Sequence, residues 1–361
     1  MSNQVLIFCD SYGQIKYALQ LIDRNYPDNA ITLVITAYPD LHRFFQVINE
    51  KLYQNSLNII HLEGYAKKRA SVKGKFSIVI GALGDIPKER RYLKEIWLQQ
   101  FAKLENNTVY FISRGCSGMA FYLLHRLSLK NKLVYIHHPP PYLQKYFPVN
   151  PKDIVKLIVS KIIYGWNLAV SKIDAYAGFP YLSDKFMQKK VFKLLNTEAE
   201  GFMDKFDYSR FRVFDTGNYD VIYYDDNLIG NGYTAGSVIF KKEINNIFDI
   251  LTKYFPGERI AYKYHPGYTG DKTLINTGVE IPAYIPAELL SPGQTKLHLS
   301  AFSWALAHVE NGTAVSISHL ITLKNDEIRK NMTAGLVGES RSKILFPHTL
   351  AEFENIVAGL E

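Results

Sequence analysis

Two neighbouring carboxylates and a later histidine are the side chains of this chain best suited to acid–base chemistry. The acids, Asp225 and Asp226, close the apolar run VIYYDD. Adjacent acids at the end of a strand repel each other, so the pKa of one can rise toward that of a useful base. The histidine, His265, ends the strand-like run IAYKYH and is followed by Pro266 and Gly267. Proline and glycine explain why the strand stops, but they leave the histidine unexplained.

Each of these residues also has an ordinary structural explanation. Asp-Asp-Asn is strong turn chemistry, so the acids could simply cap or solvate a turn. Downstream, IPAELLS contains Glu288, which suits the start of a helix, and HLSAFSWAL contains Ser300 and Ser303. A serine at a helix N-cap is ordinary, yet the same geometry offers hydroxyl and N–H donors to a phosphate. Only the order and spacing of these stretches distinguish them.

The first 150 residues alternate strand-like and helix-like segments. The β-rich runs, apolar on both faces as buried parallel strands are, lie at 5–10, 31–36, 57–62, 76–81, 108–113 and 133–138. Helical candidates between them include 15–23 and 91–104. This alternation predicts a doubly wound α/β domain at 1–150.

A basic, helix-like stretch at 151–204 interrupts this alternation and is predicted to connect two domains. A solvated helix surface would explain its charge; a peripheral membrane patch is the alternative, because lysines lie beside Ile, Trp and Phe. The alternation then resumes over 205–361, with strands at 220–226 and 259–265 and helices at 241–255 and 349–360. Two α/β halves predict a ligand-binding cleft between domains.

Length and charge narrow the class of protein. A chain of 361 residues exceeds the usual size of a single core, which favours two domains. The net charge of +8 favours anionic partners such as nucleotides, headgroups or acidic glycans. Nucleic acid is not expected, because the sequence has no zinc-finger spacing, basic tail or RNP-like motif. With two cysteines, Cys9 and Cys116, and no signal-peptide or transmembrane pattern, a cytoplasmic location is expected.

Several motif-like stretches are better explained without chemistry. Gly230-Asn231-Gly232 with Gly236 imitates a dinucleotide loop, but its spacing is wrong. His138-Pro139 belongs to a proline-rich connector. The loop SRGCSG (113–118) could hold an anion before a helix or be a plain strand–helix turn.

The series of acid pair, KYHP, IPAELL and serine pair within 220–310 resembles bacterial sialyltransferases. It most resembles the lipooligosaccharide sialyltransferases of glycosyltransferase family 52, with the bacterial polysialyltransferases as more distant relatives. The resemblance implies a GT-B fold, in which two Rossmann-like domains face each other across a cleft. It also implies inverting, metal-independent transfer of sialic acid, or a related nonulosonic acid, from a CMP-activated donor to a bacterial surface glycan. No cofactor is implied.

The resemblance further implies roles for individual residues. Asp225 or Asp226 would be the general base, His265 would contact the CMP phosphate and assist its departure, and Pro266 would shape the wall near the nucleotide. The other implied donor-binding residues are Gly267, Glu288 toward the ribose, and Ser300 and Ser303 toward the phosphate. In GT-B enzymes the N-terminal domain usually shapes the acceptor side, so the resemblance makes Ser11, Tyr12, Gly13, Arg114 and Gly115 weak candidates for contact with an acceptor.

Two departures from the family pattern leave the donor sugar open. Asn227 stands where the D/E-D/E-G motif has glycine, although asparagine tolerates a left-handed turn. The serine pair is split, since Trp304 follows Ser303. A CDP-glycerol-type glycerophosphotransferase and a non-catalytic glycan- or nucleotide-binding module remain alternatives. A lipid-linked acceptor and a peripheral contact with the inner membrane are further expectations, while acceptor, linkage and polymerisation are left open.

Overall fold

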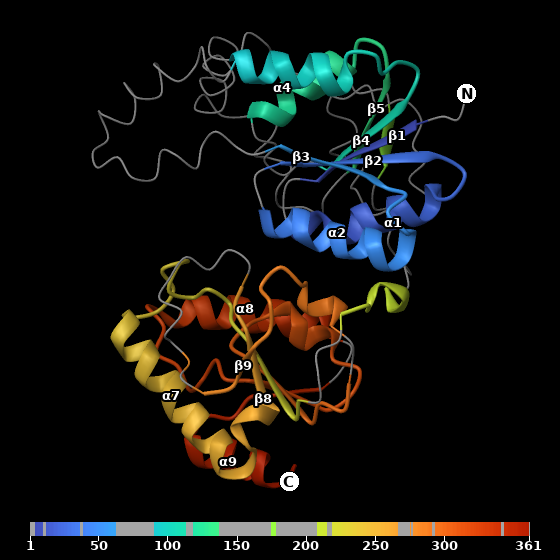
Figure 1. Cartoon of the computed structure of the whole chain (residues 1–361). Coiled ribbons are helices and arrows are strands. Elements are labelled where there is room, and N and C mark those ends of the chain that lie inside the picture. The colour runs from blue at the N-terminus through green and yellow to red at the C-terminus, as the bar shows by residue number, and fades with distance from the viewer. Residues whose placement is uncertain are drawn as a thin grey trace. The chain divides into compact units, whose positions relative to one another are not determined.

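The computed structural model describes residues 4–9, 12–36, 39–62, 90–112, 118–136, 175–177, 208–214, 219–265, 275, 277–290, 293–340 and 343–360. The chain divides into two compact units, Met1–Asp207 and Tyr208–Glu361. Each unit is built around one parallel sheet with helices on both faces (Figure 1).

The first sheet has the strand order β3-β2-β1-β4-β5-β6, and all neighbouring strands are parallel. Its strands are β1 Gln4–Cys9, β2 Ala30–Thr36, β3 Asn58–Leu62, β4 Thr108–Ile112, β5 Lys132–Ile136 and β6 Ala175–Ala177. The predicted strands at 5–10, 31–36, 57–62, 108–113 and 133–138 are thus confirmed to within two residues. The predicted strand at 76–81 lies outside the described residues.

Strand β6 differs from the sequence-based expectation. Its residues fall within 151–204, the stretch predicted to be a helical connection, yet they pair in parallel with β5. A short Ala-Tyr-Ala strand can complete the hydrogen bonding of an edge that β5 would otherwise leave open. The other residues of 151–204, and with them the predicted basic helical face, lie outside the described residues.

The helices of the first unit cover both faces of its sheet. Figure 1 shows α1 (Ile15–Asn25) and α2 (Pro39–Tyr53) on one face and α4 (Gly118–Leu127) on the other. The predicted helix at 91–104 is helical from residue 90 and continues as a π-helical turn at Trp97–Phe101. Helix α2 was not predicted, although it buries Leu41, Phe44, Phe45 and Ile48 at helical spacing.

The second sheet has the order β12-β11-β10-β7-β8-β9, again with all neighbouring strands parallel. Its strands are β7 Val221–Tyr224, β8 Ile260–Lys263, β9 Val279–Glu280, β10 Leu297–Ser300, β11 Thr313–Ser316 and β12 Ile344–Leu345. The α/β class and the two Rossmann-like domains that make up a GT-B fold are therefore confirmed. The predicted cleft between the domains stays a prediction.

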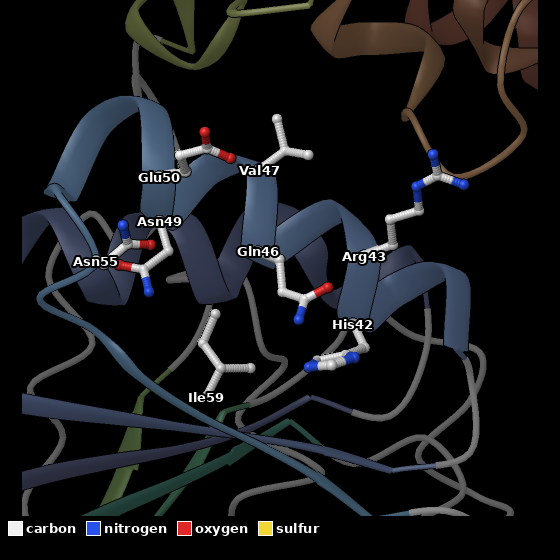
Figure 2. Close-up of a pocket in the computed structure, with 8 residues that line it drawn as sticks. All are labelled: His42, Arg43, Gln46, Val47, Asn49, Glu50, Asn55 and Ile59. Atoms are coloured by element: carbon white, nitrogen blue, oxygen red, sulfur yellow. The ribbon is translucent and has the colours of Figure 1, made fainter.

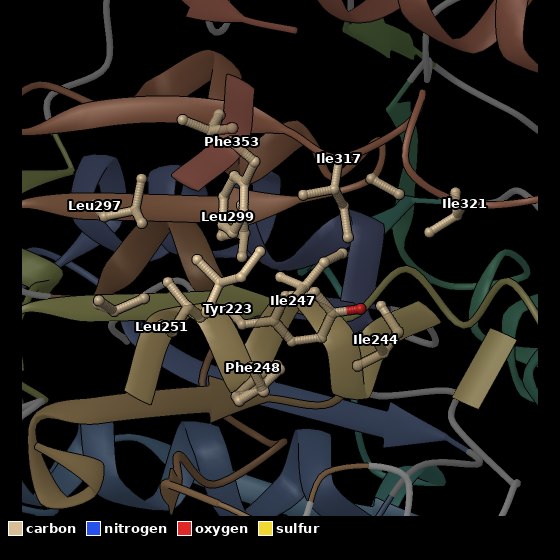
Figure 3. Close-up of a cluster of buried hydrophobic side chains, with 14 of the residues drawn as sticks. Tyr223, Ile244, Ile247, Phe248, Leu251, Leu297, Leu299, Ile317, Ile321 and Phe353 are labelled. Atoms are coloured by element: carbon tan, nitrogen blue, oxygen red, sulfur yellow. The ribbon is translucent and has the colours of Figure 1, made fainter. Parts of the chain in front are cut away.

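One apolar core joins the second sheet to helices α7 (Ser237–Tyr254) and α9 (Leu350–Ala358). Alternate residues of β7 and β10, such as Tyr223 and Leu299, enter this core, as the twofold period of a strand requires. Figure 3 shows Phe248 of α7 beside Tyr223 and Phe353 of α9 beside the strands. Ile328 and Met332 of helix α8 (Asp326–Glu339) also pack against this core. Among the helices that the structure describes, none is long and apolar enough to cross a membrane.

The burial of Phe353 predicts a measurable contribution to stability. Its side chain is fully buried in the core under α9, so Phe353→Ala should lower the free energy of unfolding by about 3–5 kcal/mol. Urea unfolding followed by circular dichroism would measure this. Leu350→Ala, at a partly exposed position of the same helix, is the control and should change the free energy by about 0.5 kcal/mol or less. Equal losses in the two variants would contradict this placement of the core.

Candidate functional site

The strand order of the second sheet places a binding site by topology alone. The chain passes from β7 to β8 and β9 on one side, then returns to lay β10, β11 and β12 on the other. The order therefore reverses between β7 and β10. In open α/β sheets, ligands bind outside the carboxyl ends of the strands at such a reversal. The site is thus expected where β7 and β10 end.

The structure brings the predicted acids, histidine and first serine together at this place. Asp225 and Asp226 directly follow β7, Ser300 is the last residue of β10, and His265 lies just beyond β8. Hydrogen bonds join them: the Ser300 hydroxyl lies 2.8 Å from Asp226 Oδ2, and the His265 N–H donates to Asp225 Oδ2 at 3.4 Å. Residues from three strands, far apart in the sequence, form one cluster.

Asp226 ties the ends of β7 and β10 together. Its Oδ2 accepts the Phe302 N–H at 2.7 Å and contacts the Ser300 hydroxyl, which also lies 2.7 Å from the Tyr224 carbonyl oxygen. Burial raises the pKa of Asp226 to about 7, against the lowering effect of the Phe302 and Ser300 hydrogen bonds. A serine has one hydroxyl proton for two acceptors. If Asp226 carries a proton, the Ser300 hydroxyl can donate to the Tyr224 carbonyl oxygen and accept a hydrogen bond from Asp226. Both short contacts are then hydrogen bonds, in agreement with the raised pKa of Asp226.

Asp225 has a different environment. Its Oδ2 accepts the Asn227 N–H at 3.0 Å as well as the His265 N–H. Its Oδ1 is buried and has no hydrogen-bond partner in the part of the chain that the structure describes. Burial raises the pKa of Asp225 to about 6, opposed by these two N–H groups and by the charge of Lys263. One carboxylate oxygen is therefore held by two N–H groups, and the other is left without a hydrogen bond from the described residues.

The turn after the acids explains the departure from glycine at residue 227. Asn227 has a φ of 53°, in the left-handed region that asparagine tolerates better than most residues. A Cβ on Gly230 would meet the Asn227 Oδ1 at 2.3 Å, and Gly232 has a φ of 68°. Two of the glycines that imitate a dinucleotide loop, Gly230 and Gly232, are thus explained by the packing and conformation of this turn.

His265 and its neighbour Lys263 have opposite exposures. His265 is exposed beyond the end of β8, whereas Lys263 is buried in the strand. The Lys263 ammonium group donates to the carbonyl oxygens of Tyr264 and Ala283, each at 3.3 Å. The lysine thereby fixes the end of β8 to the segment before Glu288. The His265 side chain is exposed to solvent, while its backbone N–H contacts Asp225.

The two predicted serines do different things. Ser300 is fully buried, and its hydroxyl is used by Tyr224 and Asp226, which makes it a support for the acids. Ser303 caps the short 3₁₀ helix Trp304–His308, and its Oγ accepts the Ala305 N–H at 3.3 Å. A contact between Ser303 and a phosphate stays a prediction. Pro266, Gly267 and the side chain of Glu288 lie outside the described residues; the Glu288 backbone belongs to the 3₁₀ helix Ala287–Leu289.

His298 and Tyr224 form a supporting contact that sequence reasoning missed. The Tyr224 hydroxyl lies 2.9 Å from His298 Nδ1, and the two rings are stacked with centroids 6.0 Å apart. Burial lowers the pKa of His298 to about 4, so the ring is neutral at pH 7. Tyr224 is thus held through both its side chain and its carbonyl oxygen, one residue before Asp225. The signal was present: His298 and Ser300 are polar residues at alternate positions of an apolar strand.

The first sheet has its own reversal between β1 and β4. The candidates Ser11, Tyr12 and Gly13 follow β1, and Arg114 and Gly115 follow β4, so they belong to the segments after these two strands. Tyr12 and Gly13 lie in the 3₁₀ turn Tyr12–Gln14. Ser11, Arg114 and Gly115 lie outside the described residues, and the acceptor-side assignment stays a prediction.

A cavity of about 500 Å³ opens between α2 and β3 in the same unit. Figure 2 shows His42 and Gln46 extending from α2 toward Ile59 of β3. The other residues that line it are Arg43, Val47, Asn49, Glu50 and Asn55. Amide, guanidinium and carboxylate groups around a small apolar wall could hydrogen-bond a hydroxyl-rich ligand. Within the described ranges, no group of three or more His, Cys, Asp or Glu side chains gathers in a way that could hold a metal ion.

The raised pKa of Asp225 predicts that Asp225→Asn stabilises the fold above pH 6. From its ordinary value of 3.8 the pKa rises to about 6 on folding, so the folded state holds the proton more tightly. The stability from this group is present in full below pH 3.8 and is lost as the pH rises through 6, about 3 kcal/mol in all. In the Asp225→Asn variant, the free energy of unfolding should lose this part of its pH dependence. The part that comes from Asp226 should remain.

Urea unfolding from pH 4 to pH 8 would test this. Asp249→Asn, at an exposed position of α7, is the matched control and should keep the pH dependence of the wild type. An Asp225→Asn variant that is less stable than the wild type at pH 8 would show that the carboxylate is well paired, contrary to the geometry.

Comparisons with known proteins add little. No protein-family model and no curated protein matches the chain. Solved structures that align with it include the glycotransferase of kitacinnamycin, at 9% identity over 100% of this chain and 91% of that chain, with a TM-score of 0.40. Arabidopsis thaliana UGT89C1 complexed with UDP aligns at 9% identity over 99% and 90%, with a TM-score of 0.44. UDP-N-acetylglucosamine 2-epimerase from Rickettsia bellii aligns at 12% identity over 100% and 88%, with a TM-score of 0.45. Likenesses of this degree carry no argument about activity.

Proposed function

We propose that the protein is an inverting glycosyltransferase that moves sialic acid, or a related nonulosonic acid, from a CMP-activated donor to a glycan acceptor without a metal ion. The observation that carries this proposal is the cluster of Asp225, Asp226 and His265 at the reversal of the second sheet. A base and a histidine stand side by side where an α/β sheet binds its ligands. The family resemblance of the motifs supplies the donor class.

Asp225 is the better candidate for the base. A base must accept a proton from the acceptor hydroxyl through an oxygen that the protein does not use. Asp225 keeps Oδ1 for this, whereas the strand-end contacts of Asp226 give that residue a supporting role. A pKa of about 6 leaves Asp225 mostly ionised at pH 7 and still basic enough to draw the proton.

His265 would act on the leaving group. When the bond from the sugar to CMP breaks, negative charge develops on the phosphate, and donors aimed at that charge lower the barrier. An exposed imidazole can become protonated as a phosphate approaches, because the anion favours the charged form of the ring. The new bond then forms with the acceptor oxygen on the opposite face of the anomeric carbon. The Asp225 carboxylate takes the proton of this oxygen, and CMP leaves with the electron pair of the broken bond.

Calorimetric titration with CMP, followed by a donor panel, tests the activity. Saturable binding of CMP and transfer from CMP-sialic acid to a simple galactoside are expected. Binding without donor hydrolysis or transfer would favour a non-catalytic module, and transfer from CDP-glycerol would favour a glycerophosphotransferase. No binding of CMP would refute the proposal. Activity that disappears with EDTA and returns with a metal ion would contradict the metal-free mechanism.

Asp225→Asn should lower the turnover of transfer by about 10²–10⁴-fold, because the amide cannot accept the proton. In the wild type, kcat/KM should fall as the pH drops below about 6, where Asp225 becomes protonated. Asp226→Asn is the matched control. Its amide oxygen can still accept the Phe302 N–H, so most of the turnover should remain. If Asp226→Asn lost more turnover than Asp225→Asn, the base would be Asp226.

His265→Ala should abolish most transfer and weaken CMP binding, while the exposed position of the side chain keeps the fold intact. His265→Asn should restore part of the binding through its amide donor but little of the turnover. Steady-state kinetics and CMP titration of the two variants would separate these effects. Turnover near that of the wild type in His265→Ala would remove the histidine from the mechanism.

A further inference from the structure

The positive charge of the protein is confined to its first unit. Met1–Asp207 contains 28 Lys and Arg against 17 Asp and Glu, whereas Tyr208–Glu361 contains 14 against 17. The second unit, which holds the proposed nucleotide site, is therefore slightly acidic. Attraction of the anionic CMP group cannot be the reason for the net charge of +8. A separate anionic partner of the first unit would explain it.

Within the first unit, two segments concentrate basic residues. Residues 90–112 and 118–136 contain two acids, Glu95 and Glu105. Their seven Lys and Arg residues are Arg90, Arg91, Lys94, Lys103, Arg126, Lys130 and Lys132. All except Arg126 are exposed, and Lys130 forms an ion pair with Glu105 at 3.1 Å.

The same two segments expose leucine side chains. Leu98 is 58% exposed and Leu129 is 64% exposed. Single exposed leucines are common on protein surfaces. Here the two come from segments that pack side by side: the Arg126 guanidinium lies 5.5 Å from the centre of the Trp97 ring, and the Asn131 amide donates to the Leu104 carbonyl oxygen. Leu98 directly follows Trp97, and Leu129 lies about one turn after Arg126.

Leu98, Leu129 and the exposed Lys94, Lys103 and Lys132 define what we call the Leu98 face. Both segments lead into the strands β4 and β5, so this face lies toward the edge of the first sheet where these strands begin. That edge is opposite the carboxyl ends of the strands. A partner on the Leu98 face would leave the ligand-binding edge of the first sheet open.

We propose that the Leu98 face binds an anionic lipid bilayer. Exposed leucines can enter the boundary of the acyl chains, while lysines beside them meet phosphate headgroups. The partly buried Trp97 between them is a residue type enriched at this depth of a membrane. Two leucines offer too small an apolar area for a stable protein interface. Binding to a nucleic acid depends on contacts between basic residues and phosphates, so it would not explain the exposed leucines. The proposal does not depend on the activity of the second unit.

Co-sedimentation of the full chain with vesicles tests this proposal. Vesicles of phosphatidylcholine and phosphatidylglycerol in equal parts should bind the protein, and vesicles of phosphatidylcholine alone should bind it far less. Lys103→Gln with Lys132→Gln should weaken binding about 25-fold, because each lysine contributes about fivefold. Leu98→Ser with Leu129→Ser should weaken it about tenfold without changing the response to salt.

Matched controls come from the second unit, where Val238 is 82% exposed and Ile239 is 48% exposed beside Lys242. Val238→Ser with Ile239→Ser, and Lys242→Gln alone, should leave vesicle binding unchanged. No binding to anionic vesicles, or equal binding by the wild type and both Leu98-face variants, would overturn the proposal. The proposal would also be overturned if heparin or RNA competes with vesicles for the protein and binds the leucine variants as tightly as the wild type. That result would point to a polyanion as the partner. Circular dichroism of every variant checks that the fold is intact.

Discussion

The contact of Asp226 with the end of β10 is the interaction on which the candidate site depends. Asp226 follows β7, yet its Oδ2 accepts the N–H of Phe302 and contacts the hydroxyl of Ser300. Parallel strands leave their carboxyl ends with polar backbone groups that no further strand satisfies. At the reversal between β7 and β10 no helix crosses directly from one strand to the other, and a carboxyl group joins the two ends instead. Asp225, the next residue toward the strand, takes its position from this joint.

This joint has a thermodynamic cost that the core must offset. Burial raises the pKa values of both acids, which means that their charged forms are less stable in the folded protein than in water. The apolar cluster on the other face of the same sheet supplies the opposing stability, through residues such as Tyr223, Leu299 and Phe353. One face of β7 therefore stabilises the fold, while the acids at the carboxyl end of β7 lower the stability of the fold. Such a division is common where activity needs a strained or poorly solvated group.

The sequence predicted the elements better than it predicted the contacts. Buried parallel strands are apolar at consecutive positions, which made runs such as ITLVIT and IAYK recognisable. Helix α2 was missed because its polar residues, among them Asp40 and Lys51, mask the spacing of its buried ones. The acids and His265 were found from their types and order. The burial of Ser300 was not predictable, because it depends on the neighbouring carbonyl oxygen of Tyr224 across the sheet.

Two neighbouring aspartates can therefore serve one site in different ways, and the backbone decides which way each serves. Asp225 and Asp226 are held by different backbone N–H groups, those of Asn227 and His265 for the first and that of Phe302 for the second. The Asp226 side chain contacts Ser300 and Phe302 at the end of β10. Asp225 turns toward β8, where the N–H groups of Asn227 and His265 hold one of its oxygens. The N–H of Asn227 donates to Asp225, and its left-handed φ turns the chain away after it, so the residue that departs from the family pattern also orients the proposed base.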